Sequence, residues 1–532
     1  STSPEVRETL HAYAQRDDRI RVYYRDVNGG ISACTNTALE IATGDWIVLM
    51  GRDNALAEHA LYLVAEAINR DPNVAIVYSD EDHIDDQGRR SNPYFKPDWD
   101  YELFLGQNLI GHLGAYRTSL ARRVGGFREG LEGSQDWDFA FRVLETYLEA
   151  KVHHIPFVLC HRRQTSPILF SNTSVARAAS AAQRAVSDHL TRTDQAAEVI
   201  PSTISSFPRI TRKLPAQRPL VSVIIPTRNY CEFLQKCVDG LINRTNYKPL
   251  EIVIADNGSS EPDSLAFLAD LRTRPGFVII EDREPFNFSR LVNRGVAASS
   301  GEICVLLNND VDVINADWLD ELVSHALRPE VGAVGAKLYY ADDTLQHGGV
   351  ILGVGGVAAH EHKHVPRASD GYFGRLKLTH SLSCVTAACI AVRRAVYDAV
   401  GGFDEKHLTI AFNDVDFCIR VREAGYRIIW TPYAELYHYE SLSRGYETTP
   451  EKANRFADEI KYMRARWGEI LDNDPFYNPN LSLNPECFEI APTSRVQKPW
   501  LLHSISRQHN VNSDESALKD KKNVPFSSRA HA

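Results

Sequence analysis

The chain has 532 residues, of which 43% are apolar and 24% charged, and its formal net charge is −10. These values are typical of a globular protein with more than one domain, and they argue against a nucleic-acid partner because no basic excess is present to neutralise phosphates. No run approaches the ~20 apolar residues of a membrane span, and no signal peptide is evident. The nine cysteines include no C-x-x-C pair, so we expect reduced thiols and a cytoplasmic protein.

The first 195 residues alternate helical and strand-like periodicity. The patterns predict helices near residues 4–15, 32–42, 58–69 and 174–191, and strands at 20–24, 46–50 and 75–78. Polar residues follow the last two strands, as Gly51-Arg52-Asp53-Asn54 and as Ser79-Asp80-Glu81-Asp82. We interpret the second group as a solvated turn rather than as an acidic site. Asp136 then lies at the start of another predicted helix, and His161 follows that helix.

The stretch from Ala196 to Pro219 carries four prolines, so residues 196–218 are predicted to form a linker. Residues 219–490 return to alternating strands and helices, with mainly apolar strands at 221–225, 251–255 and 303–307, as in parallel sheets buried on both faces. Residues 491–532 are polar and lack periodicity, which predicts a disordered tail.

A repeat relates the two parts of the chain. The matched pairs 257 residues apart are Asn36 with Asn293, Gly44 with Gly301, and Asp53 with Asp310. Later in the chain the separation is larger, at 278 residues for Asp136 with Asp414 and 277 residues for His161 with His438. A constant offset that steps once by about twenty residues predicts a duplicated domain with one insertion between residues 337 and 380. The alternative is two unrelated α/β sheets that share loop chemistry.

The two copies differ at their starts. The second copy begins with a strand that ends in Pro226-Thr227-Arg228-Asn229 and a strand that ends at Asp256, and the first copy has neither. We therefore predict an α/β protein with two tandem domains, each built on a Rossmann-like, mostly parallel sheet. The first, residues 1–195, is expected to be incomplete at its N-terminus and to lack half of a nucleotide pocket.

Acidic and amide side chains follow two of the strands in the second copy. Asp256 ends one strand, and Asn308, Asp310 and Asp312 follow the run Ile303–Leu307. Ligands bind at the carboxyl edge of open α/β sheets, and carboxylate oxygens suit Mg²⁺ or Mn²⁺. The sequence therefore favours a divalent metal that screens a diphosphate, with Asp256 accepting a hydrogen bond from a base. The alternative is a solvated strand end with an Asx turn.

The predicted helix near residues 413–423 has a buried stripe of Val415, Cys418 and Ile419. Asp414 precedes this stripe by one residue, and we expect the helix dipole to keep its carboxylate ionised. An ionised carboxylate beside an acceptor hydroxyl is a general base. The alternative is the ordinary preference of Asp for helix starts.

Histidines provide two further candidates. His438 precedes Ser443-Arg444-Gly445, which offers phosphate-binding groups, so a metal or diphosphate role is expected for His438 and Arg444. The insertion carries His360-Glu361-His362-Lys363-His364. This could bind a transition metal, but alternate residues of an exposed extended loop are the commoner explanation.

Taken together, these segments resemble family 2 glycosyltransferases of the GT-A fold, over about residues 1–485. The motifs that carry the resemblance are VSVIIPTRN at 221–229, ADNGSS at 255–260, FNFSRLVNRGVAASSGEICVLLNNDV at 286–311, GGFDE at 401–405, NDVDFCIR at 413–420 and HYESLSRG at 438–445. The resemblance is nearest to tandem-domain enzymes of bacterial O-antigen and other surface polysaccharide assembly, many of them rhamnosyltransferases.

The resemblance implies inverting, metal-dependent transfer from a nucleoside-diphosphate sugar to a glycan or lipid-linked glycan, with dTDP-rhamnose as a donor. It also implies peripheral contact with the inner membrane or with other polysaccharide-assembly enzymes. By residue, the nucleotide-sugar positions are Pro226, Thr227, Asn229, Asp256, Asn308 and Asn309. Asp310 and His438 match the metal positions and Asp414 the catalytic base, with Asn308 and Asn413 replacing acidic residues of the family motifs.

In the first copy, the counterparts of these residues are Asp53, Asp136 and His161. Gly51 stands where relatives have an acidic residue, and Arg52 adds a positive charge, so this copy is expected not to transfer sugar. Two other functions remain open at this point. A sugar nucleotidyltransferase would favour a Gly-rich loop after the first strand, which Pro226-Thr227-Arg228-Asn229 is not. A non-catalytic module that binds polysaccharide or partner enzymes fits the first copy better than the second.

Overall fold

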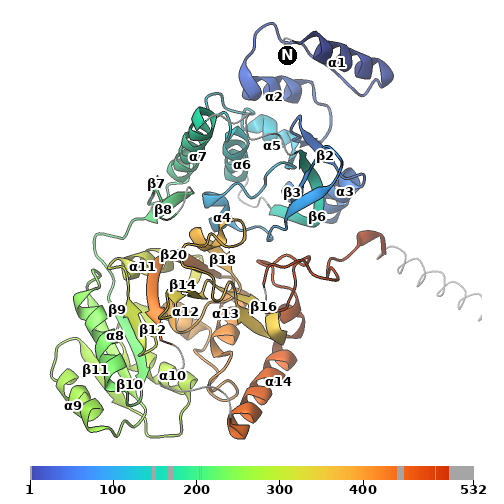
Figure 1. Cartoon of the computed structure of the whole chain (residues 1–532). Coiled ribbons are helices and arrows are strands. Elements are labelled where there is room, and N and C mark those ends of the chain that lie inside the picture. Colours follow the sequence, from blue (N-terminus) through green and yellow to red (C-terminus); the bar gives the residue numbers. More distant parts are fainter. Residues whose placement is uncertain are drawn as a thin grey trace, which may run out of the picture.

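The computed structural model describes residues 3–146, 151–163, 172–202, 204, 207–439, 449–485 and 487–501. It shows an α/β protein with one sheet in each half of the chain (Figure 1). The expected Arg444 and most of the expected tail, residues 502–532, lie outside the described residues. Within the described part, every helix is too short or too polar to cross a bilayer.

The first sheet has six strands in the order β1-β5-β3-β6-β2, with β4 paired to β3. Its strands are β1 (Trp46–Val48), β2 (Asn54–Leu56), β3 (Val74–Ile84), β4 (Arg90–Tyr94), β5 (Ala115–Arg117) and β6 (Lys151–Arg163). The helices around it are α1 (Pro4–Arg16), α2 (Gly30–Ile41), α3 (Ala60–Arg70), α4 (Tyr101–Gly106), α5 (Thr118–Arg123), α6 (Gln135–Thr146) and α7 (Asn172–Arg192). Among the described strands of this sheet, only β3 and β6 pair in parallel.

The second sheet has ten strands, in the order β11-β10-β9-β12-β19-β14-β20-β13 with β15 on β14 and β18 on β20. Its strands are β9 (Val221–Thr227), β10 (Leu250–Asp256), β11 (Phe277–Glu281), β12 (Ile303–Leu307), β13 (Val311–Val313), β14 (Val331–Tyr339), β15 (Leu345–His347), β18 (His380–Leu382), β19 (Cys389–Arg393) and β20 (Arg427–His438). The helices are α8 (Cys231–Asn243), α9 (Pro262–Leu271), α10 (Phe288–Ala298), α11 (Trp318–Ala326), α12 (Arg394–Ala399), α13 (Asn413–Glu423) and α14 (Pro450–Asp472).

Both sheets are mixed, whereas the apolar strand runs predicted mostly parallel ones. Strands β9 to β12 are parallel, as expected, and so are β14 and β20. In the second sheet β19 runs antiparallel between β12 and β14, and in the first β5 runs antiparallel between β1 and β3. A strand buried on both faces is apolar in either direction, so composition does not reveal strand direction.

The predicted repeat is confirmed by contacts that recur in both halves. Asn36 donates to the carbonyl of Phe127 at 2.9 Å and accepts from its amide at 2.7 Å. Asn293 makes the same pair of bonds with Phe403, at 3.0 and 2.9 Å. Each amide side chain ties a helix, α2 before β1 or α10 before β12, to the turn that carries the Gly-Gly-Phe motif. The two matched asparagines therefore have the same structural role, one in each half of the chain.

The first copy differs at the edge where β9 and β10 lie in the second. Strand β1 is an edge strand, whereas its counterpart β12 pairs on both sides. Residues Ile20–Tyr24, predicted as a strand, form no strand. Their counterpart β11 pairs with β10, and the described chain offers these residues no such neighbour. Helix α1 likewise buries none of its residues, while its counterpart α9 buries Leu268 and Leu271.

The predicted turn at Ser79–Asp82 is wrong, because β3 continues through it to Ile84. Asp80 is fully buried, accepting from His154 Nε2 at 2.8 Å and from the Lys96 amide at 2.9 Å. Asp82 is equally enclosed, with His161 Nδ1 at 2.6 Å. Partners distant in sequence therefore compensate the buried carboxylates, and a local pattern does not show them.

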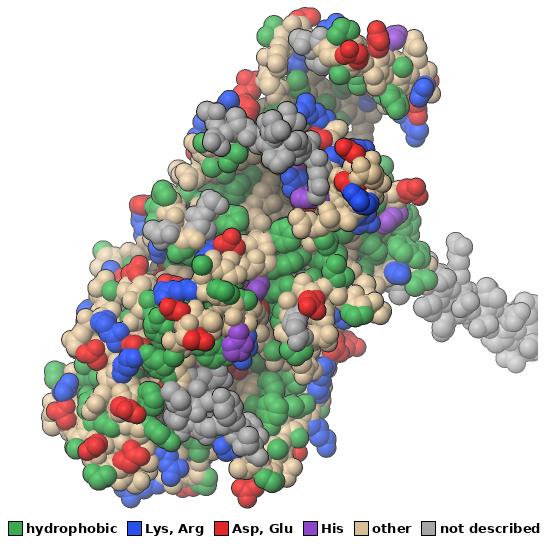
Figure 2. All heavy atoms as spheres, viewed as in Figure 1, with side chains coloured by type: hydrophobic (Ala, Val, Ile, Leu, Met, Phe, Trp, Pro, Cys, Tyr) green, Lys and Arg blue, Asp and Glu red, His purple; other side chains and the backbone are tan. Residues whose placement is uncertain are grey.

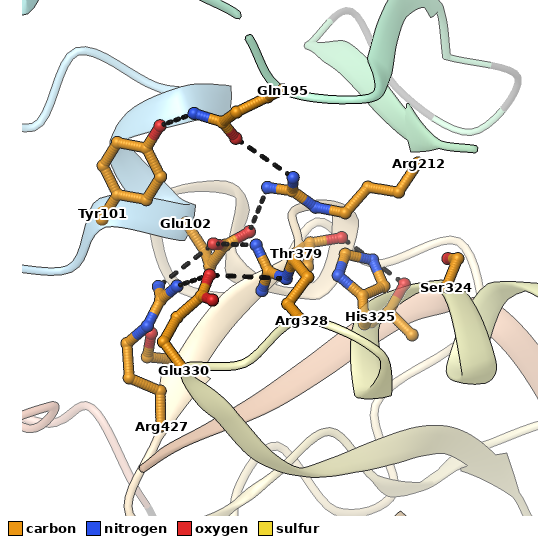
Figure 3. A network of polar contacts seen from close by, with 12 residues as sticks. Tyr101, Glu102, Gln195, Arg212, Ser324, His325, Arg328, Glu330, Thr379 and Arg427 are labelled. Carbon is orange, nitrogen blue, oxygen red and sulfur yellow. Dashed lines mark hydrogen bonds and ion pairs between the residues drawn. The ribbon is translucent and has the colours of Figure 1, made fainter. Parts of the chain in front are cut away.

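The two halves are held together by buried polar contacts as well as by the segment that links them. Within the expected linker, β7 (Ala197–Pro201) and β8 (Pro208–Arg212) form a hairpin. Glu102 of α4 is 4% exposed, and the guanidinium groups of Arg212, Arg328 and Arg427 converge on its carboxylate, at 3.2, 2.6 and 3.1 Å (Figure 3). Burial disfavours the charged carboxylate, but the three cations hold the pKa of Glu102 well below its usual range.

Candidate active site

The carboxyl ends of β10, β9 and β12 lie side by side and form the edge predicted to bind a ligand. In the parallel register, Asp256 of β10 is the partner of Thr227 of β9. The Asn309 amide, just beyond β12, donates to Thr227 Oγ1 at 3.0 Å. These three side chains therefore form a row across three neighbouring strand ends, as the sequence predicted.

At one end of this row, Asp256 is 5% exposed and accepts hydrogen bonds from Ser259, at 3.1 Å from its amide and 2.5 Å from its hydroxyl. Asn229 supports the same loop by accepting from the Ser260 amide at 2.8 Å. Pro226 is buried in β9. Asp256, Arg228 and Ser259 line a cavity of about 660 Å³. The cavity is large enough for a nucleoside, and Ser259 fixes the carboxylate inside it.

At the other end of the row, Asp310 and His438 face each other. Asp310 is 5% exposed, and its Oδ1 lies 3.2 Å from His438 Nε2. That oxygen has no hydrogen-bond partner although it is buried. The backbone fixes this approach, because the Tyr439 amide donates to the Asp310 carbonyl at 3.0 Å. A buried carboxylate oxygen without a donor is suited to a cation.

Gln346 orients the imidazole, a role that sequence reasoning did not assign. Gln346 donates its amide to the His438 carbonyl at 3.2 Å, so its own oxygen accepts from His438 Nδ1 at 2.7 Å. Nδ1 therefore carries the proton and the Nε2 lone pair points toward Asp310 and Asn308, whose amide nitrogen lies at 3.0 Å. Histidine ligands of metals are held in this way by a carbonyl oxygen at the other ring nitrogen.

Asp310, His438 and the Asn308 side chain fit a divalent cation that also takes phosphate and water oxygens. In the part of the chain that the structure describes, no group of three or more His, Cys, Asp or Glu side chains could hold a metal by itself. The His-x-His-x-His segment thus does not converge. Asp312, also expected at this edge, instead contacts Arg244 at 2.5 Å and Lys236 at 3.0 Å.

Asp414 lies in the first turn of α13 and is connected to the same edge. Its Oδ2 accepts from the Ala387 amide at 3.0 Å, and the neighbouring Ala388 carbonyl accepts from the Asn308 amide at 3.1 Å. Burial raises the pKa of Asp414, and the bonds from Ala387 and Val415 only partly oppose this effect. Burial thus outweighs the hydrogen bonds at the helix start, and the ionised state of Asp414 remains a prediction. The predicted stripe of Val415, Cys418 and Ile419 is buried.

The counterparts in the first copy are spread apart. Asp53 is half-exposed, with Arg52 Nε at 3.8 Å. His161 contacts Asp82 through Nδ1 at 2.6 Å. Asp136 accepts from the Asn108 amide at 3.0 Å, and burial raises its pKa. Within the described residues Asp53 thus faces Arg52 and His161 faces Asp82, whereas in the second domain His438 faces Asp310.

The two sheets and their helices define an α/β protein with two GT-A-like domains, and the row of Asp256, Thr227 and Asn309 lies in the second. The sequence model for glycosyl transferase family 2 matches residues 1–125 and 222–401. The chain belongs to this family, and the predicted resemblance is confirmed.

Individual relatives agree with this assignment. The chain is 46% identical over 495 residues to the Sinorhizobium fredii protein y4gI, covering 92% of this chain and 54% of the relative. It is 36% identical over 487 residues to the O-antigen biosynthesis protein RfbC of Myxococcus xanthus, covering 91% of this chain and 37% of the relative. The chain thus spans about half or less of the length of these curated relatives.

Among solved structures, a Pyrobaculum calidifontis mannosyltransferase in complex with GDP-mannose and Mn²⁺ is similar at a TM-score of 0.36 and 19% identity. That similarity covers 56% of this chain and 74% of the mannosyltransferase.

Proposed function

We propose that residues 219–490 transfer a sugar from a nucleoside-diphosphate donor to a glycan or lipid-linked glycan acceptor. The observation that carries this proposal is the connection of Asp414 to Asn308 through Ala387 and Ala388. It puts a candidate base beside the strand end that would hold the donor diphosphate. Family membership supports the same reaction class.

In this proposal the nucleoside occupies the cavity at Asp256, and Pro226, Thr227 and Asn229 belong to the adjoining end of β9 and the turn after it. Asn308, Asn309 and Arg444 contact the diphosphate or sugar. Asp310 and His438 hold Mg²⁺ or Mn²⁺, which neutralises diphosphate charge and so makes the nucleoside diphosphate a better leaving group when it is bound. The unpartnered Oδ1 of Asp310 and the His438 Nε2 lone pair support this assignment.

Asp414 acts as the general base. Its carboxylate accepts the proton of the acceptor hydroxyl, the hydroxyl oxygen forms the new bond to the anomeric carbon, and the bond from that carbon to the diphosphate oxygen breaks. Attack from the face opposite the diphosphate inverts the anomeric centre. The raised pKa of Asp414 suits this role, because a base with a pKa nearer the working pH takes up a proton more readily.

We infer that residues 1–195 do not transfer sugar and that 196–218 join the two domains. The name of the Myxococcus xanthus relative supports a place in O-antigen or related polysaccharide assembly. Such work occurs in the cytoplasm or peripherally at the inner membrane, beside other assembly enzymes. dTDP-rhamnose is our proposed donor, on family resemblance alone.

A donor screen tests this proposal. The full chain is incubated with Mn²⁺ and individual nucleoside-diphosphate sugars, with and without saccharide acceptors, and nucleoside-diphosphate release is measured. Release of a nucleoside diphosphate supports transfer. Release of pyrophosphate from a nucleoside triphosphate and a sugar 1-phosphate would instead identify a nucleotidyltransferase. Metal-independent saccharide binding without any release would identify a binding module.

A further inference from the structure

A second cavity, of about 460 Å³, lies in the first domain and is closed by one residue of the second. Twelve lining residues belong to the first domain, and the remaining one is Phe373 of the second. Phe373 stacks on Tyr94 with ring centroids 4.0 Å apart and an interplanar angle of 13°. The Gln107 amide donates to the Phe373 carbonyl at 3.4 Å. The cavity is therefore assembled by the contact between domains.

The charged groups in this cavity balance. Lys96 is only 1% exposed, and its Nζ lies 3.0 Å from Glu81 Oε2 and 3.2 Å from the Ile110 carbonyl. Arg162 lies 3.8 Å from the other Glu81 oxygen, and Asp136 supplies a second carboxylate. Two cations and two carboxylates leave no net charge to attract a phosphate, so the balance favours an uncharged polar ligand.

The other lining groups combine hydrogen-bonding side chains with aromatic surface. Asn108 donates to Asp136 at 3.0 Å, and both side chains line the cavity. The indole N–H of Trp137 donates to the Phe104 carbonyl at 2.9 Å, outside the cavity. The part of Trp137 that lines the cavity is therefore its apolar ring. Polar groups in fixed positions beside aromatic rings suit a molecule with hydroxyls on its edges and C–H groups on its faces.

Most of these residues differ in type from the second domain. Glu81 and Lys96 lie in the segment where the two copies differ by about twenty residues, and Asn108 and His112 stand where the second copy has Cys384 and Ala388. The donor side of the first domain also differs, because β1 is an edge strand and Asp53 faces Arg52. The cavity thus keeps Asp136, the counterpart of the proposed base Asp414. Among the described residues, no pair of strand ends like that at Asp256 and Thr227 lies beside it.

We propose that this interdomain cavity binds an uncharged saccharide unit of the glycan without transferring sugar to it. Glu81, Lys96, Asn108 and Asp136 would bind the hydroxyl groups, while Tyr94, Trp137 and Phe373 would contact the apolar faces. The saccharide class rests on the proposed function, and the cavity itself does not. A glycan held here would stay attached to the protein between successive transfers at the second domain.

The test measures binding without any donor. Methyl α-rhamnopyranoside, methyl α-mannopyranoside and methyl β-glucopyranoside are titrated into the full chain, and their affinities are measured by saturation-transfer NMR, with methyl β-glucuronide as a charged comparator. We expect at least one neutral probe to bind more tightly than the glucuronide. Asn108→Ala should weaken that binding about tenfold or more.

Two further variants show which domain binds the probe and whether a loss of binding reflects misfolding. Arg162→Ala, at a side chain 42% exposed, should also weaken binding and leave the unfolding midpoint unchanged. Asp414→Asn should leave the affinity within about twofold, because it alters the other domain. Binding that is lost with Asp414→Asn but kept with Asn108→Ala and Arg162→Ala, or no binding of any neutral probe, overturns the proposal. Since no donor is present, neither outcome depends on whether the second domain transfers sugar.

Discussion

Asp414 and Asn308 are joined through two adjacent residues: the Asp414 carboxylate accepts from Ala387 N, and Ala388 O accepts from Asn308 N. The sequence separates Asp414 and Asn308 by more than a hundred residues. The link makes the position of α13 depend on the end of β12. The proposed base and the proposed diphosphate-binding edge are therefore joined by hydrogen bonds through Ala387 and Ala388.

Asp414 should produce an acidic limb in the pH profile of kcat. Burial raises its pKa above the value of an ordinary aspartate. A base works only when deprotonated, so activity should rise with pH through this raised pKa and level off above it. Measuring kcat against pH at saturating donor checks the prediction. A flat profile down to the pKa of a free aspartate would contradict it.

Gln346→Ala should weaken metal binding about tenfold to a hundredfold, because His438 then loses the acceptor that fixes its tautomer. Titration with Mn²⁺ in the presence of donor, followed by calorimetry, provides the measurement. Gln87→Ala, at an exposed turn of the first domain, is a matched control. Unchanged Mn²⁺ affinity in Gln346→Ala would show that Gln346 does not orient a metal ligand.

Asp256→Ala should raise the dissociation constant of the donor about tenfold or more, since a hydrogen bond to a charged group is worth ~1.5–3 kcal/mol. Its effect on kcat should be smaller, because the nucleoside end lies away from the reacting bond. Measuring the dissociation constant of the nucleoside diphosphate for the wild-type and variant chains, beside kcat, tests this difference between binding and turnover. Equal affinity in the two chains would remove Asp256 from the nucleoside cavity.

Glu102→Gln should destabilise the chain by ~3–5 kcal/mol, because three guanidinium groups at the buried interface then lose their counter-charge. Glu330→Gln is the control, since Glu330 contacts Arg427 at a side chain 49% exposed and should change stability by less than ~1 kcal/mol. Urea unfolding of both variants gives the comparison. Because the folded pKa of Glu102 is lowered, its contribution should be lost as pH falls through that value.

The sequence predicted those features that depend on local pattern or on repetition. The apolar run Ile303–Leu307, the stripe on α13 and the Asn36 and Asn293 positions are each set by neighbours or by the offset between copies. Partners from distant segments were not predictable. The contacts of Gln346 with His438 and of Glu102 with three arginines depend on how the chain folds, not on local pattern. Ile20–Tyr24 shows the converse, because a strand-like run forms no strand without a neighbour.

Charged side chains of both signs are mixed on one face of the molecule. Acidic and basic side chains are interspersed over the second domain on the face shown in Figure 2, without a large basic patch among the described residues there. A nucleic-acid surface would instead gather Lys and Arg on one face.

The most direct test of the account is Asp414→Asn, assayed with the donor that the screen identifies. Donor binding should stay within about twofold of wild type, while nucleoside-diphosphate release that depends on acceptor should fall by about 10²–10⁴-fold. Asp53→Asn, at the first-copy counterpart of Asp310, should leave release unchanged. Wild-type turnover in Asp414→Asn would contradict the assignment of the base and, with it, the proposed mechanism of the second domain.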